Sequence, residues 1–187
     1  MLHAPIPPLE WDEAKRRRTI VERALDFADF GAFWDGRPFF EQPDRRHIAE
    51  ARYLRYGRLH GRLLLVVWTP RDAAVRIISV RPAGHREQRE IGSLIPYIWR
   101  VAETRRPGGI MATDWEKVDA TTDEDIARWI AEDPDTAPFM MLETMRDAYL
   151  VVNGVRTPLS DLPGFGDGAP AESAVDEPPA AHAVGEG

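Results

Sequence analysis

Five polar side chains in the first half of the chain have types and spacings that could act on a phosphate group. Arg76 and Arg81 flank the sequence Ile-Ile-Ser-Val, Lys15 begins a run of one lysine and three arginines, and Glu50 precedes Arg52 by two positions. Guanidinium and ammonium groups stabilise phosphate charge, and a carboxylate beside a cation can take a proton as a general base. The simpler alternatives stay open: a surface ion pair at Glu50 and Arg52, and solvated cations at Lys15 and Arg76.

Charge is divided unevenly along the chain. Residues 1–92 carry 17 Lys and Arg against 13 Asp and Glu, a net charge of +4, whereas residues 93–187 carry 7 against 18, a net charge of −11. A basic surface attracts phosphate backbones, and an acidic segment tethered to it competes for that surface. The division suggests a nucleic-acid-directed module followed by a segment that masks it. Two solvated faces of uneven composition are the alternative.

Composition excludes several classes of site. The chain has 187 residues and no cysteine, which removes disulfide frameworks, thiolate zinc sites and cysteine nucleophiles. No His, Asp and Glu cluster has metal-site spacing and no glycine-rich phosphate loop follows a strand, so we expect neither a metal nor a cofactor. The longest wholly apolar run, residues 63–68, is too short to cross a membrane, and residues 1–8 show no secretory pattern. We therefore expect a cytoplasmic protein with no membrane partner.

The first ninety residues predict helices followed by strands. Asp12 is a suitable N-cap for a helix ending near Ala24, in which Ala14, Val21 and Leu25 recur at helical spacing. Asp26 and Asp29 predict a second short helix, and a turn is predicted at His60-Gly61. Strands are predicted at 9–11, 53–56, 63–68 and 75–81, and a further short helix at 84–90. Because the gaps between the later strands are too short for crossover helices, we expect an antiparallel meander in an α+β fold.

Strand periodicity constrains which arginines can share a site. Side chains alternate between the faces of a strand, which puts Ser79 and Arg81 on one face and Arg76 on the other. Arg76 can join the same site only if a bulge or a strand end re-aims it.

The second half of the chain predicts an acidic, mainly helical segment. Thr121 or Thr122 can cap a helix carrying Ile126, Trp129 and Ile130, which Asp133-Pro134-Asp135 should stop. Its apolar stripe is too small for an independent core, so the segment needs a partner surface. A second helix is predicted at 138–147, a small hairpin at 149–157 with a turn at Asn153-Gly154, and a disordered tail rich in Gly, Ala, Pro and acidic residues.

Four segments of the first half together resemble the BrnT toxin family. They are residues 9–15 (Leu-Glu-Trp-Asp-Glu-Ala-Lys), 25–29 (Leu-Asp-Phe-Ala-Asp), 61–69, and 76–81 (Arg-Ile-Ile-Ser-Val-Arg) followed by Arg86-Glu87. The resemblance covers about residues 8–92. It implies a bacterial type II toxin with a RelE-like fold, a small antiparallel sheet with two N-terminal helices, that cleaves RNA without a metal. Where many members have Lys-His-Gly after the first helix, this chain has Glu22-Arg23-Ala24, so a histidine acid or base is not expected there.

Metal-independent RNA cleavage needs a base for the 2′-hydroxyl, cations for the pentacovalent phosphate and an acid for the leaving oxygen. Under the resemblance, Arg81 is the first candidate for phosphate stabilisation, with Arg76 beside it. Glu50 is the candidate base, Arg52 would hold the phosphate and Lys15 would reach it. Two histidines, His47 and His85, are closest to the proposed site, although a histidine on a loop often has no role.

Residues 112–158 resemble the short acidic antitoxins encoded beside such toxins. We therefore predict a toxin domain at 1–92, a linker at 93–111, an antitoxin-like segment at 112–158 and a disordered tail at 159–187. The expected partners are RNA as substrate, an acidic antitoxin in cis or as a separate chain, and operator DNA bound by the complex. The alternative is an inactive toxin scaffold that binds an antitoxin or operator DNA without cleaving RNA.

Overall fold

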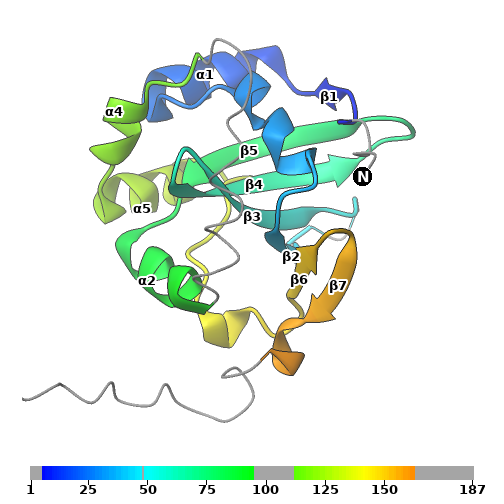
Figure 1. The fold of residues 1–187 in the computed structure, drawn as a ribbon. Helices are drawn as coiled ribbons and strands as arrows, with labels where there is room; N and C mark the ends of the chain where they lie inside the picture. Colours follow the sequence, from blue (N-terminus) through cyan, green and yellow to red (C-terminus); the bar gives the residue numbers. More distant parts are fainter. Residues whose placement is uncertain (1–5, 48, 95–111, 163–187) are drawn as a thin grey trace, which may run out of the picture.

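A computed structural model describes residues 6–47, 49–94 and 112–162. These residues form one sheet and the helices that surround it (Figure 1). The elements in chain order are β1 (Leu9–Glu10), α1 (Glu13–Arg23), the 3-10 helix η1 (Phe27–Trp34), β2 (Phe39–Pro43), β3 (Tyr53–Leu59), β4 (Arg62–Pro70), β5 (Val75–Pro82), α2 (His85–Leu94), α4 (Trp115–Asp119), α5 (Asp123–Glu132), η2 (Leu142–Thr144), β6 (Tyr149–Val152), β7 (Val155–Pro158) and η3 (Leu159–Asp161). No helix in these described ranges is long and apolar enough to cross a membrane.

The sheet has seven strands in the order β1-β5-β4-β3-β2-β6-β7. Strands β2 to β5 form the expected antiparallel meander, while β1 pairs with β5 in parallel. The turn at His60-Gly61 has positive φ at both residues, as expected for a tight hairpin. This mixture of helices and one sheet confirms the α+β class.

Each face of the sheet packs against its own apolar cluster. One cluster joins η1 residues such as Phe30 and Phe33 to Leu64 and Val66 of β4. The other contains Leu54 and Leu65 on the opposite face and draws on α2 and on residues 137–159. The C-terminal segment therefore supplies part of the core. This agrees with the prediction that the segment, whose apolar stripe is too small for a core of its own, needs a partner surface.

The buried side of α1 differs from the prediction. Val21 is 84% exposed and Ala14 is exposed, whereas Thr19 and Arg23 are buried. The guanidinium of Arg23 donates to Ser79 Oγ, to the Val80 carbonyl and to Thr136 Oγ1. The side of α1 that packs against the rest of the molecule is therefore polar, because Arg23 forms hydrogen bonds both to β5 and to the C-terminal segment.

The C-terminal segment is less helical than predicted. The helix capped by Thr122 is present as α5, with a capping box to Asp125. The helix predicted at 138–147 is wrong, because the Met140 amide donates to Glu87 and the Leu142 amide to Glu90, both on α2. Only the short η2 forms there.

The hairpin β6–β7 confirms the prediction at 149–157 and extends the sheet. Its turn residues Asn153 and Gly154 have positive φ, and β6 pairs with β2. Leu159, the first residue of the predicted tail, is instead fully buried at the start of η3. Most of the predicted linker, residues 95–111, and the rest of the predicted tail, residues 163–187, lie outside the described residues.

Candidate active site

A cavity of about 640 Å³ opens between α1, the start of β3, and the strand β5. Four of the five predicted site residues line it: Lys15, Glu50, Arg52 and Arg76. The other lining residues are Asp12, Ala14, Arg18, Arg71, Ile77, Ile78 and Asp135. Because α1 and the two strands belong to the packed part of the molecule, they hold these cations around a shared concavity.

A bulge in β5 brings Arg76 to this cavity. Thr69 of β4 pairs with Arg76 and Val67 pairs with Ser79, with a register shift between Val67 and Trp68. Two residues of β4 therefore oppose three of β5, so Arg76 and Ser79 point to the same face. The strand periodicity required a bulge or a strand end to re-aim Arg76, and this bulge does so. Within the described part of the chain, the Arg76 side chain makes no hydrogen bond or ion pair, which leaves its guanidinium available to a ligand.

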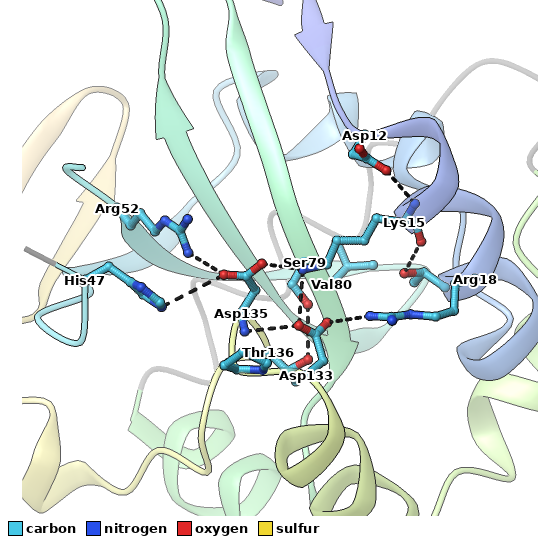
Figure 2. A network of polar contacts seen from close by, with 12 residues as sticks. Asp12, Lys15, Arg18, His47, Arg52, Ser79, Val80, Asp133, Asp135 and Thr136 are labelled. Carbon is cyan, nitrogen blue, oxygen red and sulfur yellow. Dashed lines mark hydrogen bonds and ion pairs between the residues drawn. The ribbon is translucent and has the colours of Figure 1, made fainter. Parts of the chain in front are cut away.

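The carboxylate of Asp135 lies between two of the predicted cations (Figure 2). Lys15 Nζ donates to Asp135 Oδ2 at 2.7 Å, and Arg52 Nη1 donates to Asp135 Oδ1 at 2.6 Å. Burial raises the pKa of Asp135, but the hydrogen bonds from Lys15 and Arg52 outweigh it and lower the pKa to about 2. At neutral pH the cavity therefore holds an anion supplied by the C-terminal segment.

Asp133 brings a second carboxylate to the edge of the same site. Its oxygens lie 3.2 Å from Lys15 Nζ and 3.3 Å from Arg18 Nη2. Its Oδ1 also accepts from the Asp135 amide at 3.1 Å, so one local turn presents both carboxylates. We call residues 133–138 the acidic loop.

Cationic side chains from the first half of the chain converge on the acidic loop. Those that contact its carboxylates, carbonyls or hydroxyl are Lys15, Arg18, Arg23, Arg46, Arg52 and Arg81. Such convergence is the arrangement expected of a surface that binds a polyanion.

Glu50 fixes the direction of Arg52. It accepts from Arg52 Nε at 3.0 Å and from Arg71 Nη2 at 2.6 Å. The hydrogen bonds from Arg71 and Arg52 lower the pKa of Glu50. The carboxylate is therefore ionised at neutral pH, and it turns the far end of Arg52 towards Asp135.

Arg81 does not line the cavity. Its side chain is 1% exposed and makes a two-bond ion pair with Glu87 at 2.7 Å, and it also donates to the carbonyls of Ala137 and Pro138. The acidic loop and α2 therefore cover it. In this arrangement Arg81 holds the C-terminal segment against the sheet, and its catalytic role stays a prediction.

Sequence reasoning did not assign Arg18, Arg71, Asp133 or Asp135 to the site. Arg18 belongs to the same basic run as Lys15. Asp133 and Asp135 lie in the segment that resembles acidic antitoxins, where the Asp-Pro-Asp sequence also predicts a helix stop. The sequence also named two histidines near the proposed site. One of them, His85, lies at the start of α2, with its Nδ1 at 3.2 Å from Asp123 Oδ1. His47 lies nearer, with its Nε2 at 4.0 Å from Asp135 Oδ1.

The residues that the structure describes include no group of three or more His, Asp or Glu side chains arranged to hold a metal ion. No curated protein matches the chain. Residues 11–87 match the family described as ribonuclease toxin, BrnT, of type II toxin-antitoxin system. The matched range carries all five predicted site residues, Lys15, Glu50, Arg52, Arg76 and Arg81, and it ends at Glu87 in the first turn of α2. Over residues 11–87 the chain thus has the sequence pattern of the BrnT ribonuclease toxins, which confirms the resemblance drawn from its sequence.

Proposed function

We propose that the chain is a metal-independent endoribonuclease toxin of a type II toxin-antitoxin system, neutralised by its own acidic segment. One observation supports this most directly. The carboxylate of Asp135 lines the cavity and accepts hydrogen bonds from both Lys15 and Arg52, the position in which two cations would hold a phosphate. The segment that the sequence suggested as an antitoxin thus supplies the anion.

The cavity has the groups that such a reaction requires. Glu50 takes the proton of the 2′-hydroxyl as its oxygen attacks the adjacent phosphorus. Lys15, Arg52 and Arg76 stabilise the charge that develops on the phosphate, which is the work that a metal ion performs in other nucleases. The bond to the 5′-oxygen breaks, leaving a 2′,3′-cyclic phosphate and a 5′-hydroxyl.

Neutralisation in cis follows from competition for the same cations. Because the acidic loop and the cavity belong to one chain, the loop rebinds at a high effective concentration and keeps RNA out. An RNA, or a partner that binds the loop, must displace Asp133 and Asp135 for the cavity to open. We place the activity in the bacterial cytoplasm, where RNA is present, and operator DNA remains a predicted partner of the complex.

The experiment compares the full chain with the double variant Asp133→Asn/Asp135→Asn. Each protein is incubated with end-labelled RNA in EDTA, and cyclic-phosphate ends are measured. Removing both charges should raise cleavage by about tenfold or more, since about 1.4 kcal/mol of lost attraction changes the open fraction tenfold. Adding Arg52→Ala to the double variant should abolish that cleavage.

A matched control removes two other carboxylates of the same segment. Asp147→Asn/Asp161→Asn changes the net charge equally but touches neither Lys15 nor Arg52, and it should cleave RNA no faster than the unaltered chain. Equal rates for both double variants would contradict neutralisation by the loop. RNA that stays intact with every variant, yet is bound in a salt-sensitive way, would favour the inactive scaffold.

A further inference from the structure

We propose that His47 is the general acid of this site, the group that gives a proton to the 5′-oxygen as it leaves. This inference rests on the proposed ribonuclease function and adds to it a residue that neither the family match nor the cavity lining assigns. It starts from one contact: His47 Nε2 lies 4.0 Å from Asp135 Oδ1.

The Asp135 carboxylate marks the position of a phosphate. Its two oxygens accept from Lys15 at 2.7 Å and from Arg52 at 2.6 Å, and Arg and Lys use the same donors for carboxylate and phosphate. When RNA displaces the loop, a phosphate oxygen takes the place of Asp135 Oδ1. The ring of His47 then lies beside that phosphate (Figure 2).

The ring nitrogen of His47 that faces Asp135 bonds no other group in the described part of the chain. Nε2 of His47 is shielded from solvent and has no hydrogen-bond partner among the residues that the structure describes, although the side chain as a whole is 30% exposed. A buried polar atom without a partner costs free energy, so a ligand that bonds it is favoured. The position leaves Nε2 free for a substrate oxygen.

The other candidates for an acid at this site are less suitable. Arginine stays protonated and releases a proton poorly, and Glu50 is ionised at neutral pH by its contacts with Arg71 and Arg52. Lys15 is already assigned to the phosphate charge, and a lysine ammonium releases its proton near neutral pH less readily than an imidazolium does. Of the histidines in the described ranges, His60 packs against the Trp115 ring in a tilted geometry and His85 faces Asp123, and neither lines the cavity. Histidine is the side chain that gains and loses a proton near neutral pH.

The complete step then balances. The 2′-oxygen bonds to phosphorus as Glu50 takes its proton, and the bond from phosphorus to the 5′-oxygen breaks with its electron pair on that oxygen. The proton on Nε2 of the His47 imidazolium passes to the 5′-oxygen. The enzyme leaves the step with Glu50 protonated and His47 neutral, and one proton exchange with water resets both.

Substituting the leaving atom tests this role. In the Asp133→Asn/Asp135→Asn chain, single-turnover cleavage is measured on an RNA with one ordinary linkage and on the same RNA with sulfur in place of the bridging 5′-oxygen. A thiolate leaves without a proton, so the sulfur substrate does not need an acid. His47→Gln should slow the ordinary substrate by about 10²-fold or more but the sulfur substrate by only about threefold.

A matched variant shows what loss of phosphate stabilisation looks like. Lys15→Met should slow both substrates to a similar extent, because the charge on phosphorus develops with either leaving group. As a second measurement, His47→Ala should regain cleavage of the ordinary substrate when free imidazole is added. Thermal unfolding of each variant establishes that it is folded.

Several results would overturn the assignment. Equal slowing of both substrates by His47→Gln would mean that His47 only shapes the loop, and no slowing would mean that it has no role. If the Asp133→Asn/Asp135→Asn chain cleaves neither substrate, the proposed ribonuclease function itself falls. That outcome is distinct from the first two, in which the parent variant cleaves RNA.

Discussion

The acidic loop and the hairpin β6–β7 belong to the same C-terminal segment but are held to the rest of the molecule by different forces. The loop is held by ion pairs and hydrogen bonds to cations such as Lys15 and Arg52. The hairpin is held by its backbone ladder to β2 and by the burial of Leu150. Charge contacts can be exchanged for those of a phosphate, whereas a strand pairing and a buried core cannot.

This difference implies that any opening of the site is local. Removing the whole segment would expose the edge of β2 and the apolar face around Phe40, Leu54 and Tyr56. Displacing the acidic loop alone leaves that core intact. The segment is therefore an integral part of the fold that carries one exchangeable loop.

The contact with the largest expected effect anchors the end of the loop to the fold. Glu87→Ala should lower the free energy of unfolding by about 3–5 kcal/mol, because it leaves the Arg81 guanidinium buried without its partner. It also removes the acceptor of the Gly84 and Met140 amides. Urea unfolding of the full chain measures the change. Glu87→Ala with Arg81→Met should cost less than Glu87→Ala alone, and a single-variant loss below about 1 kcal/mol would show that the pair is not a structural anchor.

The hairpin should be nearly as sensitive at its apolar contacts. Leu150 is 3% exposed and packs in the cluster with Phe40, so Leu150→Ala should lower the free energy of unfolding by about 3 kcal/mol. The same variant should not raise RNA cleavage at temperatures where it is folded, because the acidic loop stays in place. Increased cleavage without unfolding would show that the hairpin and loop open together.

Local chemistry explains what the sequence could predict. N-caps at Asp12 and Thr122 and tight turns at His60-Gly61 and Asn153-Gly154 depend on residues close in the chain, and all four are present. The strands of the meander follow from their apolar, β-branched composition.

Contacts between distant residues explain what the sequence could not predict. The helix expected at 138–147 fails because the amides of Met140 and Leu142 bond to carboxylates on α2. The place of Arg81 depends on carbonyls of the acidic loop more than fifty residues away. The sequence could state that Arg76 needs a bulge but not that the bulge exists.

The acidic loop should contribute less to the free energy of unfolding than Glu87 or Leu150 does, and its contribution should depend on pH. Asp135 has a pKa of about 2 in the folded chain, against 3.8 for an unperturbed aspartate. Because the folded pKa is the lower one, the ionised carboxylate stabilises the fold above about pH 4 and loses that contribution as the pH falls towards about 2. Its side chain is 31% exposed, so after solvent screening the contribution is about 1 kcal/mol.

Unfolding of the unaltered chain and of Asp135→Asn, compared at two pH values, checks this. The difference between them should be about 1 kcal/mol at pH 6 and about half of that at pH 3. A difference that grows at lower pH would contradict the ion-pair account. High salt should also reduce it, since partly exposed charges are screened.

The smallest effect on the free energy of unfolding is expected at an exposed ion pair between the C-terminal segment and residues 1–92. Arg45 and Asp147 form an ion pair of 2.8 Å, but their side chains are 75% and 56% exposed. Asp147→Asn should therefore change the free energy of unfolding by less than about 0.5 kcal/mol and leave RNA cleavage unaltered. The pair has the same charges and joins the same two parts of the chain as Asp135 and Arg52, and it differs in burial and in distance from the cavity. Suppose that Asp147→Asn lowered the free energy of unfolding as much as Asp135→Asn does. Ion pairs anywhere between the two parts of the chain would then hold them together, and the contacts at the cavity would not be specifically responsible for neutralisation.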